Sequence, residues 1–282
     1  MSVSYSIAAS LSSPAVSPRL AVRLARSLHA AVGRADRSLP RGVTHLCLQL
    51  LLWIGFYFAY NITRGLADRD VSRAFENGRE IASAEERLGL LFEPSLQDVL
   101  DRSALLTSLT AWTYWLSQFV IVGAALVYVY LRQHERFAFF RNWLILANTA
   151  GLVCYVLIPT APPRMFADLG FTDTLARSSS VDHDTVGRLA NEYAAMPSLH
   201  AMDAFIVAVV MFAVVRRPLA RLLWLAWPAW VSFALMATAN HYWLDIAAGF
   251  TIAIVVALAL RPSHISLRIP SLRRTAPARQ QR

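Results

Sequence analysis

Long apolar stretches constrain the fold of this chain more than any other feature of its sequence. A helix needs about 20 mostly apolar residues to cross the ~30 Å hydrocarbon core of a bilayer. Six stretches approach or exceed that length: 43–60, 107–131, 142–159, 199–215, 220–239 and 243–260. Charged residues make up only 16% of the chain, against roughly 25% in soluble domains. The sequence therefore predicts an all-α, polytopic membrane protein with six transmembrane helices.

The ends of the chain differ in composition from this apolar region. Residues 1–42 carry six arginines and lack the apolar run and cleavage site of a signal peptide, so we expect a basic, disordered tail. Residues 43–260 are expected to form one six-span membrane domain, and 261–282 a second basic tail.

One segment between the first two spans predicts a further helix. In EIASAEERLGLLF (80–92), Ile81, Leu88 and Leu91 recur at near-helical spacing, opposite a charged run from Glu85 to Arg87. This pattern is typical of an amphipathic helix that lies along the membrane interface.

The placement of arginine predicts the orientation of the spans. Cytoplasmic flanks of membrane proteins hold an excess of basic residues. If the N-terminus is cytoplasmic, the inner segments contain 18 of the 27 arginines, and the outer segments contain 9 arginines with 14 of the 18 acidic residues. We therefore expect an integral protein of a bacterial plasma membrane with both termini in the cytoplasm. Residues 160–198, the start of the fourth span and the link between the last two spans then share the outer face.

Several classes of partner and cofactor are not expected. The net charge of +9 does not indicate a nucleic-acid partner, because the arginines lie beside apolar segments rather than among aromatic residues on a polar surface. Cys47 and Cys154 lie inside apolar runs and give neither a disulfide framework nor a metal signature. Neither HExxH nor CxxC spacing is present, so no metal or other cofactor is expected, although His200 and His241 keep a metal site as a weak alternative.

Ionisable groups at membrane spans are costly and therefore mark candidate sites. In IPTAPPRMF (158–166), prolines stiffen the turn that carries Arg164, whose guanidinium could either hold a phosphate or contact lipid head groups. In MPSLH, Pro197 and Ser198 predict a helix start, where free N–H groups bind anions and His200 lies in the first turn. A hydrogen bond to a neighbouring loop is the alternative role of this histidine.

Two further acidic residues fall inside predicted spans. Within ATANHYWLDIAAG (237–249), His241 and Asp245 are four residues apart, a spacing that places them on one helical face and predicts a histidine oriented by a carboxylate. A structural His–Asp pair that caps the helix is the alternative. Asp203 follows His200 by three residues and is expected to pair with that histidine or with Arg164, or to bind a polar head group.

Together these motifs resemble the type 2 phosphatidic acid phosphatase superfamily over roughly residues 140–260. PSLH at 197–200 is similar to the PSGH of that family's second motif, and HYWLD at 241–245 matches the HxxxD that ends its third. The PSLH variant, the PTAPPR stretch and the six spans look more like the branch that contains inositol phosphorylceramide synthases. Two features of the common pattern are missing: the chain has no lysine, and Ala234 and Leu235 replace the Ser-Arg pair of the third motif.

The resemblance implies roles for the candidate residues. His241 would attack phosphorus and form a phosphohistidine, Asp245 would orient it, and His200 would protonate the leaving oxygen. The residues expected to bind substrate are Arg164, Arg188, Ser198 and Asp203.

The implied activity is that of a membrane-embedded lipid phosphatase or phosphotransferase. It would act on a lipid phosphate or phospholipid at the extracytoplasmic face, with the bilayer as its environment. Head-group transfer of the inositol phosphorylceramide synthase type is one alternative. A non-catalytic protein that binds or transports lipid is the other. The sequence predicts no oligomeric state.

Overall fold

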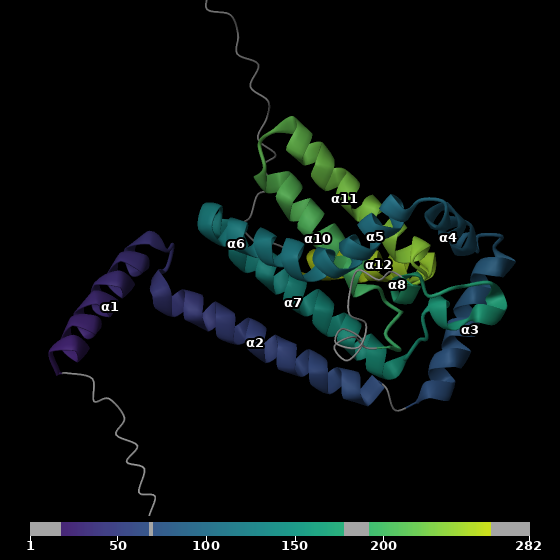
Figure 1. The fold of residues 1–282 in the computed structure, drawn as a ribbon, viewed down its shortest axis with the longest axis horizontal. Helices are drawn as coiled ribbons and strands as arrows, with labels where there is room; N and C mark the ends of the chain where they lie inside the picture. The colour runs from purple at the N-terminus through teal and green to yellow at the C-terminus, as the bar shows by residue number, and fades with distance from the viewer. Residues whose placement is uncertain (1–17, 68–69, 178–191, 261–282) are drawn as a thin grey trace, which may run out of the picture. The chain divides into compact units, whose positions relative to one another are not determined.

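A computed structural model describes residues 18–67, 70–177 and 192–260 of the 282-residue chain. The described residues are mostly helical and contain no strand beyond an isolated parallel bridge between Thr160 and Ala194 (Figure 1). The chain divides into two compact units, Met1–Trp53 and Ile54–Arg282. The predicted all-α class is confirmed.

The first unit contains α1 (Pro18–Ser38) and the beginning of α2 (Gly42–Ala67). The carboxylate of Asp36, near the end of α1, accepts the N–H of Val43 at 2.8 Å and so caps the first turn of α2. Gly42 has a φ of +71°, a conformation that glycine adopts without a steric penalty. Residues 1–42 are expected to form a basic tail, but α1 is helical, whereas α2 corresponds to the first predicted span.

The second unit contains the rest of the helices of the described chain. They are α3 (Val71–Arg87), α4 (Glu93–Asp101), α5 (Ala104–Leu116), α6 (Val122–Arg132), α7 (His134–Leu157), α8 (Thr174–Arg177), α10 (Leu199–Val214), α11 (Pro218–Ala237) and α12 (Trp243–Leu260). A π-helical turn, η1 (Ser117–Ile121), joins α5 and α6 into one continuous span. Within the described residues, five segments are long and apolar enough to cross a membrane: α2, α5–α6, α7, α11 and α12.

The sixth predicted span is the shorter helix α10, which lies inside the bundle. It has 16 residues, so it is about 24 Å long. It packs against α6, α7, α11 and α12, and most of its side chains are buried. Two glycines permit this close packing: a Cβ at Gly151 of α7 would collide with the side chain of Leu199, and one at Gly249 of α12 would lie 2.5 Å from the carbonyl oxygen of Ser198. Because protein surrounds α10, its length need not match the lipid thickness.

The boundaries of α7 correct one expectation. The predicted spans 107–131 and 142–159 leave residues 132–141, with three arginines, as the loop between them, but α7 already begins at His134. Phe137 and Phe140 are buried, and the Arg136 guanidinium donates to the carbonyl oxygen of Ala213 at 2.8 Å. Packing of this stretch against the end of α10 therefore extends the helix into the segment that its charge marks as a loop.

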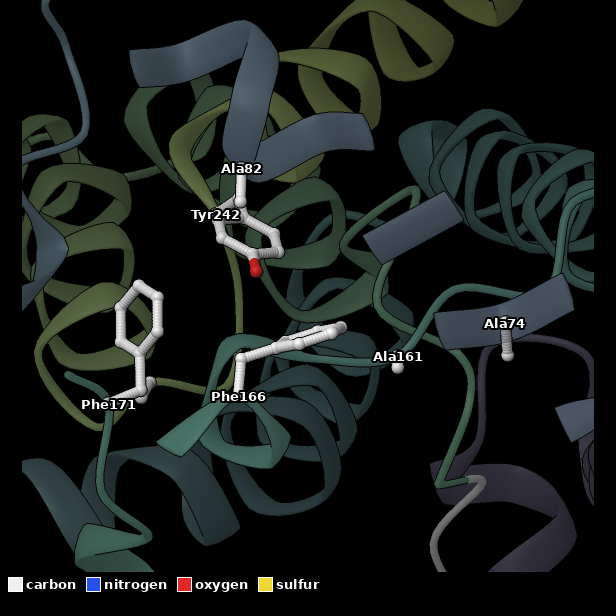
Figure 2. Close-up of a cluster of buried hydrophobic side chains, with 7 residues drawn as sticks. Ala74, Ala82, Ala161, Phe166, Phe171 and Tyr242 are labelled. Atoms are coloured by element: carbon white, nitrogen blue, oxygen red, sulfur yellow. The ribbon is translucent and has the colours of Figure 1, made fainter. Parts of the chain in front are cut away.

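The predicted amphipathic helix corresponds to α3, which ends at Arg87, and the burial of two residues is opposite to the prediction. Glu85 is completely buried, whereas Leu88 is 61% exposed just beyond the end of the helix. The buried stripe of α3 instead follows Ala74, Gly78 and Ala82. This stripe packs on the loop after α7, in a cluster that includes the aromatic rings of Phe166, Phe171 and Tyr242 (Figure 2). Small residues thus decide which face is buried.

Candidate active site

Three segments that are distant in sequence meet at one end of the bundle. The loop after α7 and the segment before α10 are paired through their backbones, since the Thr160 N–H donates to the Tyr193 carbonyl at 2.8 Å and the Ala195 N–H to the Thr160 carbonyl at 3.1 Å. The Arg164 N–H donates to the Ala239 carbonyl at 2.8 Å, which joins the same loop to the link between α11 and α12. These are the segments that the sequence analysis assigns to one membrane face.

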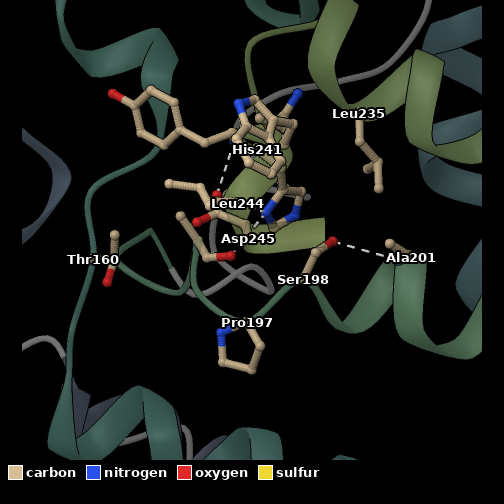
Figure 3. Close-up of polar contacts among 12 residues, drawn as sticks. Thr160, Pro197, Ser198, Ala201, Leu235, His241, Leu244 and Asp245 are labelled. Atoms are coloured by element: carbon tan, nitrogen blue, oxygen red, sulfur yellow. Dashed lines mark hydrogen bonds and ion pairs between the residues drawn. The ribbon is translucent and has the colours of Figure 1, made fainter. Parts of the chain in front are cut away.

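The start of α10 is held by Ser198. Its hydroxyl accepts the N–H of Ala201 at 3.3 Å, which makes it the N-cap, and its side chain is fully buried (Figure 3). Its own N–H donates to the backbone carbonyl of Asp245 at 2.9 Å. The helix start predicted from Pro197 and Ser198 is confirmed, and a main-chain hydrogen bond ties it to α12.

His241 is oriented by a backbone carbonyl as well as by Asp245. Its Nδ1 lies 2.8 Å from the Ala195 carbonyl oxygen and 3.5 Å from Asp245 Oδ2. Since a carbonyl oxygen can only accept a hydrogen bond, Nδ1 carries the proton, and Nε2 of the neutral ring keeps its lone pair. Sequence reasoning missed Ala195, because a carbonyl group leaves no signal in the residue type.

The His241–Asp245 contact does not run along a helical face, as the four-residue spacing predicts. His241 lies before the first residue of α12, so the two side chains meet across the turn that starts the helix. Asp245 Oδ2 also accepts the Tyr242 N–H at 2.9 Å, in the manner of a capping box. The carboxylate therefore both contacts the histidine and caps α12 (Figure 3).

His200 faces the same region from the first turn of α10. Its ring stacks on that of Tyr114, with centroids 4.6 Å apart and planes 20° apart, and its centroid is 6.2 Å from that of His241. The structure thus brings both predicted histidines together. Tyr114 was not predicted, since it is one of several aromatic residues in an apolar span.

Arg164 is held by a polar network that includes Asn240, the residue before His241. Its Nη1 donates to Asn240 Oδ1 at 2.7 Å, and its Nε lies 3.7 Å from Asp173 Oδ2. Asn240 donates in turn to Thr238 Oγ1 at 2.9 Å. The side chain of Arg164 is 19% exposed. Arg188, the other predicted guanidinium, lies outside the described residues.

Asp203 has partners that differ from the expected ones. It is nearly buried and accepts a hydrogen bond from Asn148 Nδ2 of α7 at 2.7 Å. Gln118 in the π-turn η1 also hydrogen bonds to it. The structure contains no ion pair of Asp203 with either His200 or Arg164, so the predicted pairing is wrong. Side chains from two neighbouring helices satisfy the carboxylate instead.

Two buried glutamates near the site were not predicted as part of it. Glu93 Oε1 accepts the Trp243 N–H at 2.8 Å, and Glu85 Oε1 accepts the Leu244 N–H at 3.0 Å. Burial raises the pKa of Glu85 to about 8, and burial also raises the pKa of Glu93. Both residues lie some 150 positions before α12, so no local pattern could reveal the contact.

A pocket of about 500 Å³ opens beside the start of α12. Its lining residues are Asn77, Glu80, Ile81, Ala84, Arg87, Ile158, Met196 and Leu244. The pocket therefore combines apolar walls with a few polar and charged groups. In the described part of the chain, no three His, Cys, Asp or Glu side chains are arranged to hold a metal ion.

Comparison with protein families matches residues 79–259 to the PAP2 superfamily. This is more than half of the chain, and the matched region runs from α3 to α12 and includes Arg164, the PSLH segment and the HYWLD segment. Neither curated proteins nor solved structures give a match. The chain therefore belongs to the PAP2 superfamily, which supports a lipid enzyme of the phosphatase or phosphotransferase type.

Proposed function

We propose that this protein cleaves a phosphoester bond of a membrane lipid through a phosphohistidine at His241. The supporting observation is the pair of acceptors on one side of its ring. Ala195 O and Asp245 Oδ2 both face Nδ1, so the proton stays there and Nε2 is free for attack. Nε2 forms a bond to phosphorus while the P–O bond to the leaving group breaks. The positive charge that the ring acquires is stabilised by the Asp245 carboxylate.

His200 is the proposed proton donor to the leaving oxygen. It lies beside His241 and is supported by the ring of Tyr114. In the second step, His200 accepts a proton from water or from an alcohol, whose oxygen attacks phosphorus as the N–P bond breaks. This step regenerates both histidines. It also leaves hydrolysis and group transfer as variants of one mechanism.

The phosphate oxygens would bind at the start of α10 and at Arg164. Free N–H groups at a helix start favour an anion, and a guanidinium supplies two parallel donors. Asn240, the residue before His241, holds the Arg164 guanidinium in place. Ala234 and Leu235, at the positions of the Ser-Arg pair of the common motif, are fully buried in apolar packing and add no phosphate contact. Arg164 therefore carries more of the binding than it would in relatives with the full motif.

The proposed reaction is tested with the purified protein in nanodiscs and dioleoyl phosphatidic acid as the probe. We expect release of inorganic phosphate, and a radiolabelled phosphohistidine that is labile in acid and stable in base. His241→Ala should abolish both signals. His134→Ala, a histidine at the start of α7 that the mechanism does not use, should leave them unchanged. Turnover by the His241 variant at the parental rate would overturn the mechanism.

The same preparation distinguishes the alternatives for the acceptor. A new phosphodiester lipid formed from a phospholipid and an added polyol, without phosphate release, would favour head-group transfer of the inositol phosphorylceramide synthase type. Lipid binding without turnover of either probe would favour a non-catalytic protein that binds or transports lipid.

We also propose that the site faces the extracytoplasmic side, which the distribution of arginine supports. Ala167 is exposed beside the loop of Arg164. In a background without Cys47 and Cys154, Ala167→Cys should react with a membrane-impermeant maleimide in intact cells. Labelling only after lysis would contradict this orientation.

A further inference from the structure

The first turn of α12 is held by three carboxyl groups from three different elements. The first N–H groups of a helix have no partner within the helix. From Tyr242 to Leu244, each of these groups donates to a different carboxyl: to Asp245 at 2.9 Å, to Glu93 at 2.8 Å and to Glu85 at 3.0 Å. Only the first of these carboxyls belongs to α12 itself. The start of this helix is therefore fixed by α3 and α4, which lie outside the spans.

The two glutamates share one environment that cannot easily hold two charges. Both are completely buried, and no donor group of the described chain reaches the second oxygen of either side chain. Nor are the acids of the described chain arranged to bind a metal ion. A proton on one carboxyl supplies the missing donor, since the protonated side chain can hydrogen bond to the other carboxylate.

The protonation of Glu85 agrees with this geometry. Burial raises its pKa to about 8, and the charges of Glu93 and Asp245 and a hydrogen bond to Glu93 act in the same direction; only the hydrogen bond from Leu244 opposes the shift. Burial also raises the pKa of Glu93, although its hydrogen bonds with backbone N–H groups and with Glu85 act in the opposite direction. Both shifts favour a proton on the pair at neutral pH.

We propose that Glu85 and Glu93 are positioning residues for the reaction: as a carboxyl pair that holds one proton, they fix the backbone between His241 and Asp245. This inference rests on the proposed function. The two N–H groups they accept belong to Trp243 and Leu244, which lie between the two functional residues. Displacement of this turn would move the imidazole and its carboxylate together. A misplacement of about 1 Å can reduce a rate by roughly 100-fold.

Further titratable groups of the described chain act on the pair and on its neighbour Tyr242. Asp245 faces it from α12, and Tyr242 lies at the start of that helix, where burial and the three acids raise its pKa. Arg79 of α3 acts on Tyr242 in the opposite direction. Loss of the shared proton above about pH 8 would therefore place a further negative charge in this cluster.

The experiment compares kcat, KM and the pH profile of Glu85→Gln and Glu85→Ala with dioleoyl phosphatidic acid in nanodiscs. Glutamine keeps an acceptor for Leu244, so we expect kcat within about threefold of wild type near pH 6.5, whereas alanine should lower kcat at least tenfold with little change in KM. Wild-type kcat should decline above about pH 8, and Glu85→Gln should lack this decline. Glu86→Gln, on the exposed face of the same helix, is the matched control.

Hydrogen exchange of the peptide that covers 242–246 separates this inference from the proposed function. Protection of the Trp243 and Leu244 amides should fall in Glu85→Ala and Glu93→Ala, persist in the glutamine variants, and fall in wild type above about pH 8. If wild type turns over no lipid phosphate but shows this protection pattern, only the proposed function fails. Alanine variants with parental kcat and protection, or a Glu85→Gln variant with the wild-type decline at high pH, would overturn the inference.

Discussion

Gly249→Ala tests how closely α12 must approach the start of α10. A Cβ at this position would lie 2.5 Å from the carbonyl oxygen of Ser198, about 0.9 Å inside the ordinary contact distance of 3.4 Å. This oxygen belongs to the backbone, and two hydrogen bonds fix the Ser198 backbone: its carbonyl accepts the Met202 N–H, and its N–H donates to the Asp245 carbonyl. The two helices must therefore separate, because no flexible side chain can move aside.

The expected cost has a structural and a catalytic part. Overpacking of a dense core costs about 1–3 kcal/mol, so the melting temperature of the variant in detergent should fall. The separation also moves Ser198 and His200 away from His241, and a displacement near 1 Å corresponds to a loss of roughly 10- to 100-fold in kcat. Turnover of dioleoyl phosphatidic acid in nanodiscs measures this loss.

Gly123→Ala is the control for this prediction. Gly123 lies in α6, and a Cβ there would meet nothing within 4 Å, so the change should leave activity intact and alter stability by no more than about 1 kcal/mol. If Gly249→Ala had the melting temperature and kcat of wild type, the close approach of α12 to Ser198 would not constrain the site, and the reasoning would be refuted.

Three further predictions concern other buried groups. Asn148→Leu removes a donor to Asp203 and should destabilise the protein by about 1–3 kcal/mol. The double variant with Asp203→Leu should recover part of this loss. A melting temperature unaffected by Asn148→Leu alone would contradict the role of Asn148 as a donor to Asp203. Tyr114→Phe should retain the stacking that supports His200, whereas Tyr114→Ala should lose it. Only the alanine variant should therefore slow turnover of an alkyl phosphate more than that of an aryl phosphate, and equal effects on both substrates would argue against His200 as the proton donor. The pKa of Glu85 is about 8 in the folded protein and 4.5 in the unfolded chain, so its contribution to stability is complete below about pH 4.5 and is lost as the pH rises to about 8. Glu85→Gln should flatten this part of the plot of unfolding free energy against pH, and identical plots for the variant and wild type would show that the pKa is not raised.

Signals that depend on neighbouring residues predicted much of the fold. Apolar length located α2, α5–α6, α7, α11 and α12, because a bilayer of fixed thickness demands a minimum run of apolar residues. A proline and a serine located the start of α10 within one residue, because a cap acts on the N–H groups that follow it directly. Such local signals were wrong where packing between helices sets the boundary: residues 132–141 were predicted to be a loop, yet α7 includes most of them.

The candidate site, too, was predicted correctly where local spacing decides and wrongly where packing between helices decides. The spacing of His241 and Asp245 predicted that the two side chains meet on one helical face. They do meet, but across the turn that starts α12, because His241 lies before the helix. Charge placed Glu85 on the polar side of an amphipathic helix, whereas small residues bury that side against the loop after α7. Hydrophobic periodicity describes a helix in isolation, and it cannot show that a buried N–H group elsewhere needs a carboxylate.

Residue types and their spacing are enough to predict a helical membrane protein and the two histidines and one arginine that gather at one end of it. These conclusions rest on residue type and on interactions within a single turn or span. The groups that hold those residues come from the packing of the helices: the Ala195 carbonyl contacts His241, Asn240 contacts Arg164, and the glutamates of α3 and α4 contact the start of α12. Backbone groups carry no sequence signature, and contacts between segments far apart in the chain arise only when the packing of the helices places them within hydrogen-bond distance.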